Sequence, residues 1–444
     1  MIRILTAFLA AALALCPAGM QARDITQAPA LPPLDKMVVY SASPRLFAKE
    51  NSLDAVRRQL DKIKALGCNV IWLLPVYDES PLRFGSPYSM KDMFTVGAEY
   101  GGNEALIRFV KAAHKKGICV ILDIITWGTG PDCQWVREHP SWYREAYPRD
   151  YKKGAYFNWD TPELREMCLN LMRFWIDNAD VDGFRCDTAC PNFEKGIKTD
   201  DWQWIISNLR ASYPDRPLLM LAEAAPPRSL AAGFDMNYGW HYCDALEKLY
   251  RKPDVSTKIL FETNTEEMEG AAAAGPDKVR MRYSTNHDKC VKGSPAEKFG
   301  GQRGAMVATA LAYTMGGVPM VYSSQEIGYP EHLSFFKGKP PVLDWTTGKD
   351  IRDEFTRLLR VTLRHSMRKG SLTELHADTS TIAYLRSDES EQVLVLANVR
   401  EDPAPVPLGR DFLDGTYVNL MTDQPFIFET NVLEGHQYLI LLKK

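Results

Sequence analysis

The sequence lacks three signals that would assign it to a common functional class. It has no Cys-x-x-Cys pair and no tight cluster of cysteine and histidine, which argues against a zinc site. It has no long run of lysine or arginine, and a net charge of −3 gives no general basic surface for nucleic acid. Beyond its first residues it has no long uncharged apolar run, so the mature chain is not expected to cross a membrane.

The first 22 residues, "MIRILTAFLAAALALCPAGMQA", have the pattern of a secretory signal: Arg3, an apolar stretch from Ile4 to Leu15, then small residues. We therefore interpret 1–22 as a signal peptide and 23–36 as a Pro-rich linker, and we expect an exported chain, periplasmic or extracellular. The segment "ALALC" also resembles an imperfect lipoprotein box, so a lipid anchor at Cys16 is the alternative. Removing Cys16 leaves eight cysteines, several in apolar patterns typical of buried free thiols.

After the linker, short apolar runs alternate with longer amphipathic ones, and eight strand candidates alternate with helices. This rhythm is typical of a parallel sheet covered by helices, and eight such units close a barrel. The sequence predicts an α/β fold, a (β/α)₈ TIM barrel over 37–368. A loop-rich stretch at about 126–160 predicts a short insertion after the third strand. The predicted strands lie at 37–42, 69–76, 118–125, 181–189, 217–224, near "GFDMNY", at 279–288 and at 318–326.

From residue 371 the sequence consists of short strand patterns, such as "STIAYLRS" and "QVLVLANV". Turns with polar residues, proline and glycine separate them. No long helical pattern follows. Residues 369–444 are therefore predicted to form a C-terminal all-β sandwich domain.

The chemistry is expected where the barrel strands end, because active sites of such barrels lie at the C-terminal ends of the strands. Four predicted strands end in carboxylates, namely Asp123, Asp187, Glu223 and Asp288. Arg185 stands two residues before Asp187, and a strand has a period of two, so both side chains point to one face. A structural ion pair is the simpler interpretation of this pair alone, but four acids aimed at one mouth repel one another and raise at least one pKa.

Two carboxyl groups in one pocket, one ionised and one protonated, are what glycoside hydrolysis needs. Arg185 is expected to favour the ionised form of Asp187. Glu223 follows the apolar "LLMLA" without an adjacent cation, and is expected to keep its proton.

The segments "VDGFRCDTA", "LLMLAEA" and "MRYSTNHDK" closely resemble three motifs of the α-amylase family, glycoside hydrolase family 13, in order and spacing. The resemblance implies that Asp187 is the nucleophile of a retaining double displacement and Glu223 the general acid/base. It implies that Asp288 and His287 bind the sugar at the cleavage point, and that Arg185 holds Asp187 ionised. Tyr88, in "SPYS", would stack on the same sugar, and Asp123 is a further candidate substrate contact.

The remaining family motif, at the end of the third strand, usually reads D-x-x-x-N-H, whereas this chain reads "DIITWG". Trp127 and Gly128 thus replace asparagine and histidine. That asparagine often helps to bind calcium, and an indole cannot replace a hard oxygen ligand, so no calcium is expected there and no cofactor elsewhere. Trp127 is kept as a candidate substrate contact, with packing as the alternative. Lys289 and Lys292 are interpreted as solvated loop residues, or else as a sign of an anionic glycan.

The leading hypothesis is an exported retaining α-glycosidase acting on α-linked glucans such as starch or maltooligosaccharides. Transglycosylation on the same scaffold is the first alternative, since water or another sugar can take the covalent intermediate. A catalytically retired glycan-binding protein is the second, suggested by the broken third motif. The intact set of Asp187, Glu223 and Asp288 favours catalysis.

Overall fold

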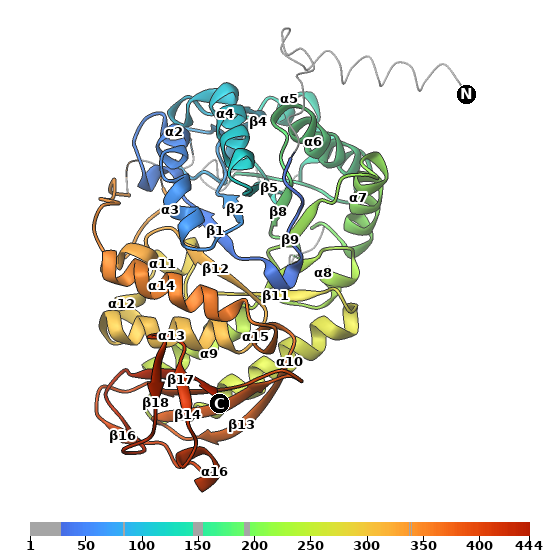
Figure 1. Ribbon diagram of the computed structural model, residues 1–444. Helices are drawn as coiled ribbons and strands as arrows, with labels where there is room; N and C mark the ends of the chain where they lie inside the picture. Colours follow the sequence, from blue (N-terminus) through green and yellow to red (C-terminus); the bar gives the residue numbers. More distant parts are fainter. Residues whose placement is uncertain (1–27, 83–84, 145–153, 191–195, 337, 339) are drawn as a thin grey trace.

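The protein consists of a barrel with a smaller β domain packed below it (Figure 1). The computed structural model describes residues 28–82, 85–144, 154–190, 196–336, 338 and 340–444. The interpretations of 1–22 as a signal peptide and of Cys16 as a lipid anchor lie outside these residues, as does part of the linker and of the insertion.

Eight parallel strands close into a barrel in the order β1-β12-β11-β10-β9-β8-β5-β2. The eightfold rhythm of the sequence is therefore confirmed. Most residues of these strands are buried, as expected where side chains fill the barrel on one face and meet helices on the other. The strands are β1 (Val39–Ala42), β2 (Val70–Leu73), β5 (Cys119–Ile125), β8 (Gly183–Asp187), β9 (Leu219–Ala222), β10 (Met236–Tyr238), β11 (Val279–Arg282) and β12 (Val318–Tyr322).

Helices follow each strand and form the outer layer of the barrel (Figure 1). They carry an apolar face inward, as α4 shows with buried Leu106, Phe109 and Val110 between polar positions. The outer helices are α2 (Ser52–Arg57), α3 (Leu60–Ala65), α4 (Gly102–Lys115), α6 (Glu163–Ala179), α7 (Thr199–Ser212), α8 (Arg228–Ala231), α9 (Trp240–Arg251), α10 (Lys258–Ala274), α13 (Gly301–Thr314), α14 (Lys349–Thr362) and α15 (His365–Arg368).

Two short hairpins stand on the loops of the barrel. β3 (Tyr77–Glu79) pairs with β4 (Met90–Val96) after β2, and β6 (Gly128–Thr129) pairs with β7 (Ala155–Tyr156) after β5. The second hairpin lies in the stretch predicted as an insertion, together with the short helix α5 (Trp135–Glu138).

The seventh strand is shorter than the predicted 279–288. β11 ends at Arg282, and the side chain of Asn286 caps a short helix, α11 (His287–Cys290), by accepting a hydrogen bond from the Lys289 N–H. The prediction that Asp288 ends a strand is therefore wrong, because the strand ends before it and the capped helix has already begun at His287.

The C-terminal domain is a six-stranded antiparallel sheet with a second, two-stranded sheet, as an all-β domain requires. The order of the larger sheet is β13-β14-β15-β20-β17-β18, so the last strand of the chain lies in its middle. Its strands are β13 (Ser371–Ala377), β14 (Thr381–Ser387), β15 (Gln392–Asn398), β17 (Tyr417–Asn419), β18 (Gln424–Phe426) and β20 (Tyr438–Lys443), and the smaller sheet joins β16 (Ala404–Pro405) to β19 (Val432–Leu433), with one helical turn, α16 (Arg410–Leu413), between them.

One hydrophobic core runs from the barrel into this domain, because Ile382, Tyr384, Val395 and Ile440 belong to the same cluster as the barrel residues. The eight cysteines from Cys68 to Cys290 are free thiols, seven of them buried, as predicted. Burial raises the pKa of Cys168 to about 12, which leaves that thiol unreactive.

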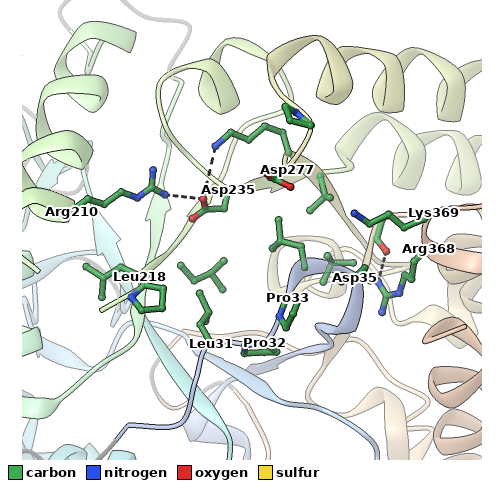
Figure 2. A pocket seen from close by; sticks show the side chains of 18 of the residues that line it. Leu31, Pro32, Pro33, Asp35, Arg210, Leu218, Asp235, Asp277, Arg368 and Lys369 are labelled. Atoms are coloured by element: carbon green, nitrogen blue, oxygen red, sulfur yellow. Dashed lines mark hydrogen bonds and ion pairs between the residues drawn. The ribbon is translucent and has the colours of Figure 1, made fainter. Parts of the chain in front are cut away.

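A cavity of about 850 Å³ lies at the N-terminal end of the barrel strands, against Leu31 to Asp35 (Figure 2). Several polar side chains that line it are bonded to protein groups. Asp235 accepts hydrogen bonds from Arg210 and from the Met220 N–H, and the half-buried Arg368 donates to the carbonyls of Thr362 and Met37. This end of the barrel is opposite the C-terminal ends of the strands, where the candidate site carboxylates lie.

Among the residues that the structure describes, no helix combines the length and the apolar character needed to span a bilayer.

Candidate active site

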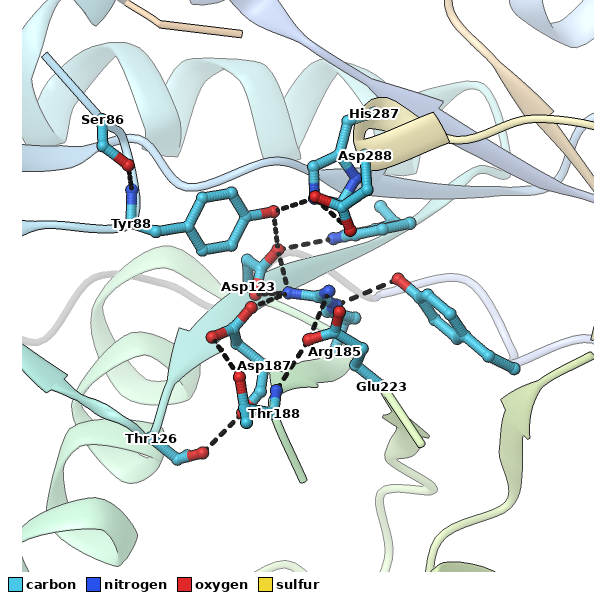
Figure 3. A network of polar contacts seen from close by, with 12 residues as sticks. Ser86, Tyr88, Asp123, Thr126, Arg185, Asp187, Thr188, Glu223, His287 and Asp288 are labelled. Atoms are coloured by element: carbon cyan, nitrogen blue, oxygen red, sulfur yellow. Dashed lines mark hydrogen bonds and ion pairs between the residues drawn. The ribbon is translucent and has the colours of Figure 1, made fainter. Parts of the chain in front are cut away.

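The centre of the site is β8, where alternation brings Arg185 and Asp187 to the inner face while Phe184 and Cys186 point to the outer one. The guanidinium Nη1 of Arg185 lies 2.9 Å from Oδ1 of Asp187. Arg185 has no exposed surface, and 9% of the Asp187 side chain is exposed. The predicted pair therefore exists, buried at the mouth of the barrel (Figure 3).

Asp123 is brought to the same point by the register of the barrel, because it lies opposite Arg185 in the β5–β8 ladder. Its Oδ1 is 2.7 Å from Nη1 of Arg185, and its Oδ2 accepts from the Trp72 indole and the Tyr88 hydroxyl. Burial raises the pKa of Asp123 to about 7, although the charge of Arg185 opposes this. Asp123 lies at the base of the site with no exposed side chain, behind Tyr88.

Glu223 follows β9 directly, and its backbone continues the ladder to β8 through the Cys186 carbonyl. The expectation that it has no adjacent cation is wrong: Nη2 of Arg185 lies 3.0 Å from its Oε2. This contact joins β8 to the residue that follows β9, so the residues next to Glu223 in the sequence do not reveal it. Burial nevertheless raises the pKa of Glu223 well above its usual range, Arg185 opposes this, and the charges of Asp187 and Asp288 add to it.

His287 and Asp288 come from α11, on the other side of the mouth. Oδ2 of Asp288 is 3.6 Å from Nε2 of His287, and 38% of the Asp288 side chain is exposed. The Tyr88 ring stacks on the His287 ring at 5.4 Å, and its hydroxyl is 2.8 Å from Nε2. Burial lowers the pKa of His287, so this imidazole is neutral at pH 7. The structure thus brings these three candidates together with Arg185 and Asp123.

Trp72 and Tyr238 belong to this site but were not predicted from the sequence. Together with the predicted Tyr88, their rings surround the Arg185 guanidinium, with Trp72 at 4.9 Å, Tyr238 at 5.6 Å and Tyr88 at 5.7 Å. Trp72 and Tyr238 occupy inward positions near the ends of β2 and β10, so strand alternation could have identified them. Such rings stabilise a buried cation through their negative faces.

Trp127 and Gly128 differ from the family pattern for a reason visible in the β6–β7 hairpin. Gly128 has φ +157°, and a Cβ atom there would lie 2.0 Å from the carbonyl oxygen of Ala155. No histidine fits at this position without moving β7. The Trp127 indole packs against Tyr156, with ring centroids 5.0 Å apart, and against Gly154, which favours the packing interpretation.

The residues at the family calcium position do not fit that ion, because the buried indole of Trp127 offers no oxygen ligand. Within the described part of the chain, no group of three or more His, Cys, Asp or Glu side chains is arranged to hold a metal.

Lys289 is neither solvated nor directed into the site, so both sequence interpretations of it are wrong. It is buried and forms ion pairs with Asp244 and Glu247 on α9, which ties α11 to the barrel wall. Lys292 is exposed.

The arrangement places two carboxyl groups in different states within one pocket. Asp187 is ion-paired with Arg185, whereas the proton of Glu223 is favoured by burial and by neighbouring negative charge. A barrel with such a pair at its C-terminal mouth has the layout of a glycosidase site. The fold and the carboxyl pair together therefore define a barrel protein of the glycosidase class.

The comparisons with known proteins agree with this class. Residues 48–153 match the family described as "Alpha amylase, catalytic domain", and residues 372–440 match "Maltogenic Amylase, C-terminal domain". The α-amylase MalA of Haloarcula japonica is 28% identical over 437 residues, covering 90% of this chain and 61% of its own length. An α-1,4-glucan:maltose-1-phosphate maltosyltransferase of Cereibacter sphaeroides is 25% identical, covering 80% of this chain and 64% of its own length.

The fold is also that of a solved structure, a noncanonic maltogenic α-amylase, AmyB, of Thermotoga neapolitana. It has a TM-score of 0.77 at 24% identity and covers 92% of this chain and 99% of that one. These matches show that the chain is similar to proteins of the α-amylase family over most of its length. It spans less than two thirds of the length of the two curated relatives described above.

Proposed function

We propose that this chain is an exported retaining α-glycosidase that hydrolyses α-linked glucans or maltooligosaccharides. The observation that carries the proposal is the shared guanidinium of Arg185, which contacts both Asp187 and Glu223 through separate nitrogen atoms. Two carboxyl groups held by one guanidinium lie close together, and a short separation favours the retaining mechanism over the inverting one.

In the first step, an oxygen of Asp187 attacks the anomeric carbon while the glycosidic bond breaks. Glu223 delivers its proton to the leaving oxygen. In the second step Glu223 removes a proton from water, the water oxygen bonds to the anomeric carbon, and the ester to Asp187 breaks. The raised pKa of Glu223 supports its role as the acid of the first step.

The sugar at the cleavage point would lie against the stacked rings of Tyr88 and His287. Asp288, the most exposed of the site acids, is placed to accept hydrogen bonds from sugar hydroxyls. We assign Trp127 a packing role in the β6–β7 hairpin and no contact with the sugar. Export is supported by the leader-like pattern of residues 1–22 and, as in the sequence interpretation, a lipid anchor at Cys16 is the alternative.

Transglycosylation is a second candidate because the maltosyltransferase from Cereibacter sphaeroides is similar over 80% of this chain. The two reactions share the covalent intermediate and differ in whether water or a sugar accepts it.

The test is mass spectrometry of products from maltooligosaccharides, isomaltose and pullulan, with the wild type and with Asp187→Asn and Glu223→Gln. Shorter products from the wild type alone support hydrolysis, whereas longer ones support transfer. NMR of the first products separates mechanisms, because retention yields the α-anomer first and inversion the β-anomer. No products, with sugar binding still measured by calorimetry, would instead support a glycan-binding protein.

A further inference from the structure

Thr188 has a backbone conformation that threonine rarely adopts. Its φ is +50°, in the left-handed region, and it directly follows Asp187. A β-branched residue is a genuine outlier there, and such outliers concentrate where the surroundings require them. The sequence gives no signal for this, because the residue looks like an ordinary strand end.

The conformation directs two donors of Thr188 at two different carboxylates. Its backbone N–H lies 2.7 Å from Oε2 of Glu223, and its hydroxyl lies 3.0 Å from Oδ2 of Asp187 (Figure 3). Arg185 holds the other oxygen of Asp187, Oδ1, at 2.9 Å. Like Arg185, Thr188 thus touches both groups.

We infer that Thr188 is a positioning residue that fixes the two reacting carboxylates relative to each other. Its N–H holds Glu223, and its hydroxyl orients the oxygen of Asp187 that Arg185 leaves open. This rests on the proposed function, in which Asp187 and Glu223 carry out the reaction.

Three variants separate the hydroxyl from the strained backbone. Thr188→Val keeps the branched shape and loses the hydroxyl, Thr188→Ser keeps the hydroxyl, and Thr188→Gly relieves the backbone but loses the hydroxyl. We expect Thr188→Val to lower kcat about tenfold with KM within twofold of the wild type, since it removes one charge-assisted hydrogen bond. Thr188→Ser should restore kcat, and Thr188→Gly should unfold at higher temperature than Thr188→Val.

A second readout does not depend on turnover. Thr188→Val should unfold at a lower temperature than the wild type, because Oδ2 of Asp187 loses its hydrogen bond from the hydroxyl, and Thr188→Ser should unfold near the wild-type temperature. Wild-type kcat in Thr188→Val, or no rescue of kcat by Thr188→Ser, overturns the inference. An inactive wild type overturns the proposed function instead, while the Tm comparison still decides the part played by Thr188.

Discussion

Arg185 shows what the sequence reveals of the site at the level of residues and what it does not. Strand alternation predicted that Arg185 and Asp187 share a face, and they lie 2.9 Å apart. The contacts of Arg185 with Asp123 and Glu223 depend on the register of three strands, which no local pattern contains. The strain at Thr188 is likewise a product of the assembled barrel.

The pH dependence of activity follows from Glu223. Burial raises the pKa of this carboxyl well above 4.5, Arg185 opposes this, and Asp187 and Asp288 raise it further. In the proposed mechanism the first step needs the protonated form of Glu223, so activity should persist above pH 4.5 and fall as pH rises through the raised pKa. Asp288→Asn removes one of the charges that raise it, so the basic limb of its residual kcat/KM should move to lower pH.

The matched control for this measurement is Asp277→Asn, an exposed acid at the opposite end of the barrel. Its basic limb should coincide with that of the wild type. An unmoved limb in Asp288→Asn would show that another group controls alkaline inactivation.

At the scale of elements, the sequence located the barrel strands well because each is a short apolar run between amphipathic helices. It failed at the loops. The end of β11 was misplaced because the cap at Asn286 starts α11. The sequence indicated that Gly128 replaces a histidine, but it did not reveal that the β6–β7 hairpin leaves no room for that side chain.

The hairpin can be tested by Gly128→Ala. Because the added Cβ meets the Ala155 carbonyl at 2.0 Å, this variant should lose about 2–4 kcal/mol of unfolding free energy. Gly102→Ala is the control, since Gly102 also has positive φ, +71°, but has open space around it, and should cost only about 1 kcal/mol. Urea unfolding followed by circular dichroism measures both. Equal losses would mean that β7 moves aside freely.

A second element-level prediction concerns the packing of α4 on β8. His114, near the end of α4, lies between two aspartates that precede β8, with Nε2 2.8 Å from Asp182 and Nδ1 3.4 Å from Asp180. Although burial lowers its pKa, these two carboxylates raise it from 6.5 to about 9. The protonated histidine therefore stabilises the fold fully below pH 6.5, and this contribution is lost as pH rises through about 9.

The variant His114→Gln should lose on the order of 2 kcal/mol at pH 6, and the difference from wild type should nearly vanish above pH 9. Thermal unfolding at a series of pH values measures this. The opposite trend, a difference that grows with pH, would mean that the imidazole is neutral in the folded protein.

For the whole molecule, the alternation of strands and helices was enough to predict a barrel followed by a β domain, because parallel barrel strands follow one another around the sheet. The order of the C-terminal sheet was not predictable in the same way. β20 pairs with both β15 and β17, a choice made by long-range packing rather than by neighbouring sequence.

The shared core predicts that both domains unfold together. The Tyr384 ring packs edge-on against Phe261 of α10 at 5.9 Å, and its hydroxyl bonds to Thr314 of α13. Tyr384→Ala should therefore destabilise the barrel by about 3–5 kcal/mol, although it lies in the other domain. All ten tryptophans lie before residue 346, so tryptophan fluorescence reports the barrel alone.

Urea unfolding followed by this fluorescence should shift to lower concentration in Tyr384→Ala, with a smaller shift in Tyr384→Phe, which loses only the hydroxyl. A barrel transition unchanged by Tyr384→Ala would show that the two domains are thermodynamically separate.

The same continuity limits how the chain can be recombined with its relatives. A chimera that joins this barrel to the β domain of one of these relatives would bring a foreign surface against α10 and α13. Because Tyr384, Ile382 and Val395 are buried in one cluster with the barrel, the exchange cuts through a core rather than a linker. Successful domain grafts should therefore carry the facing positions Phe261 and Thr314 along with the transplanted sheet.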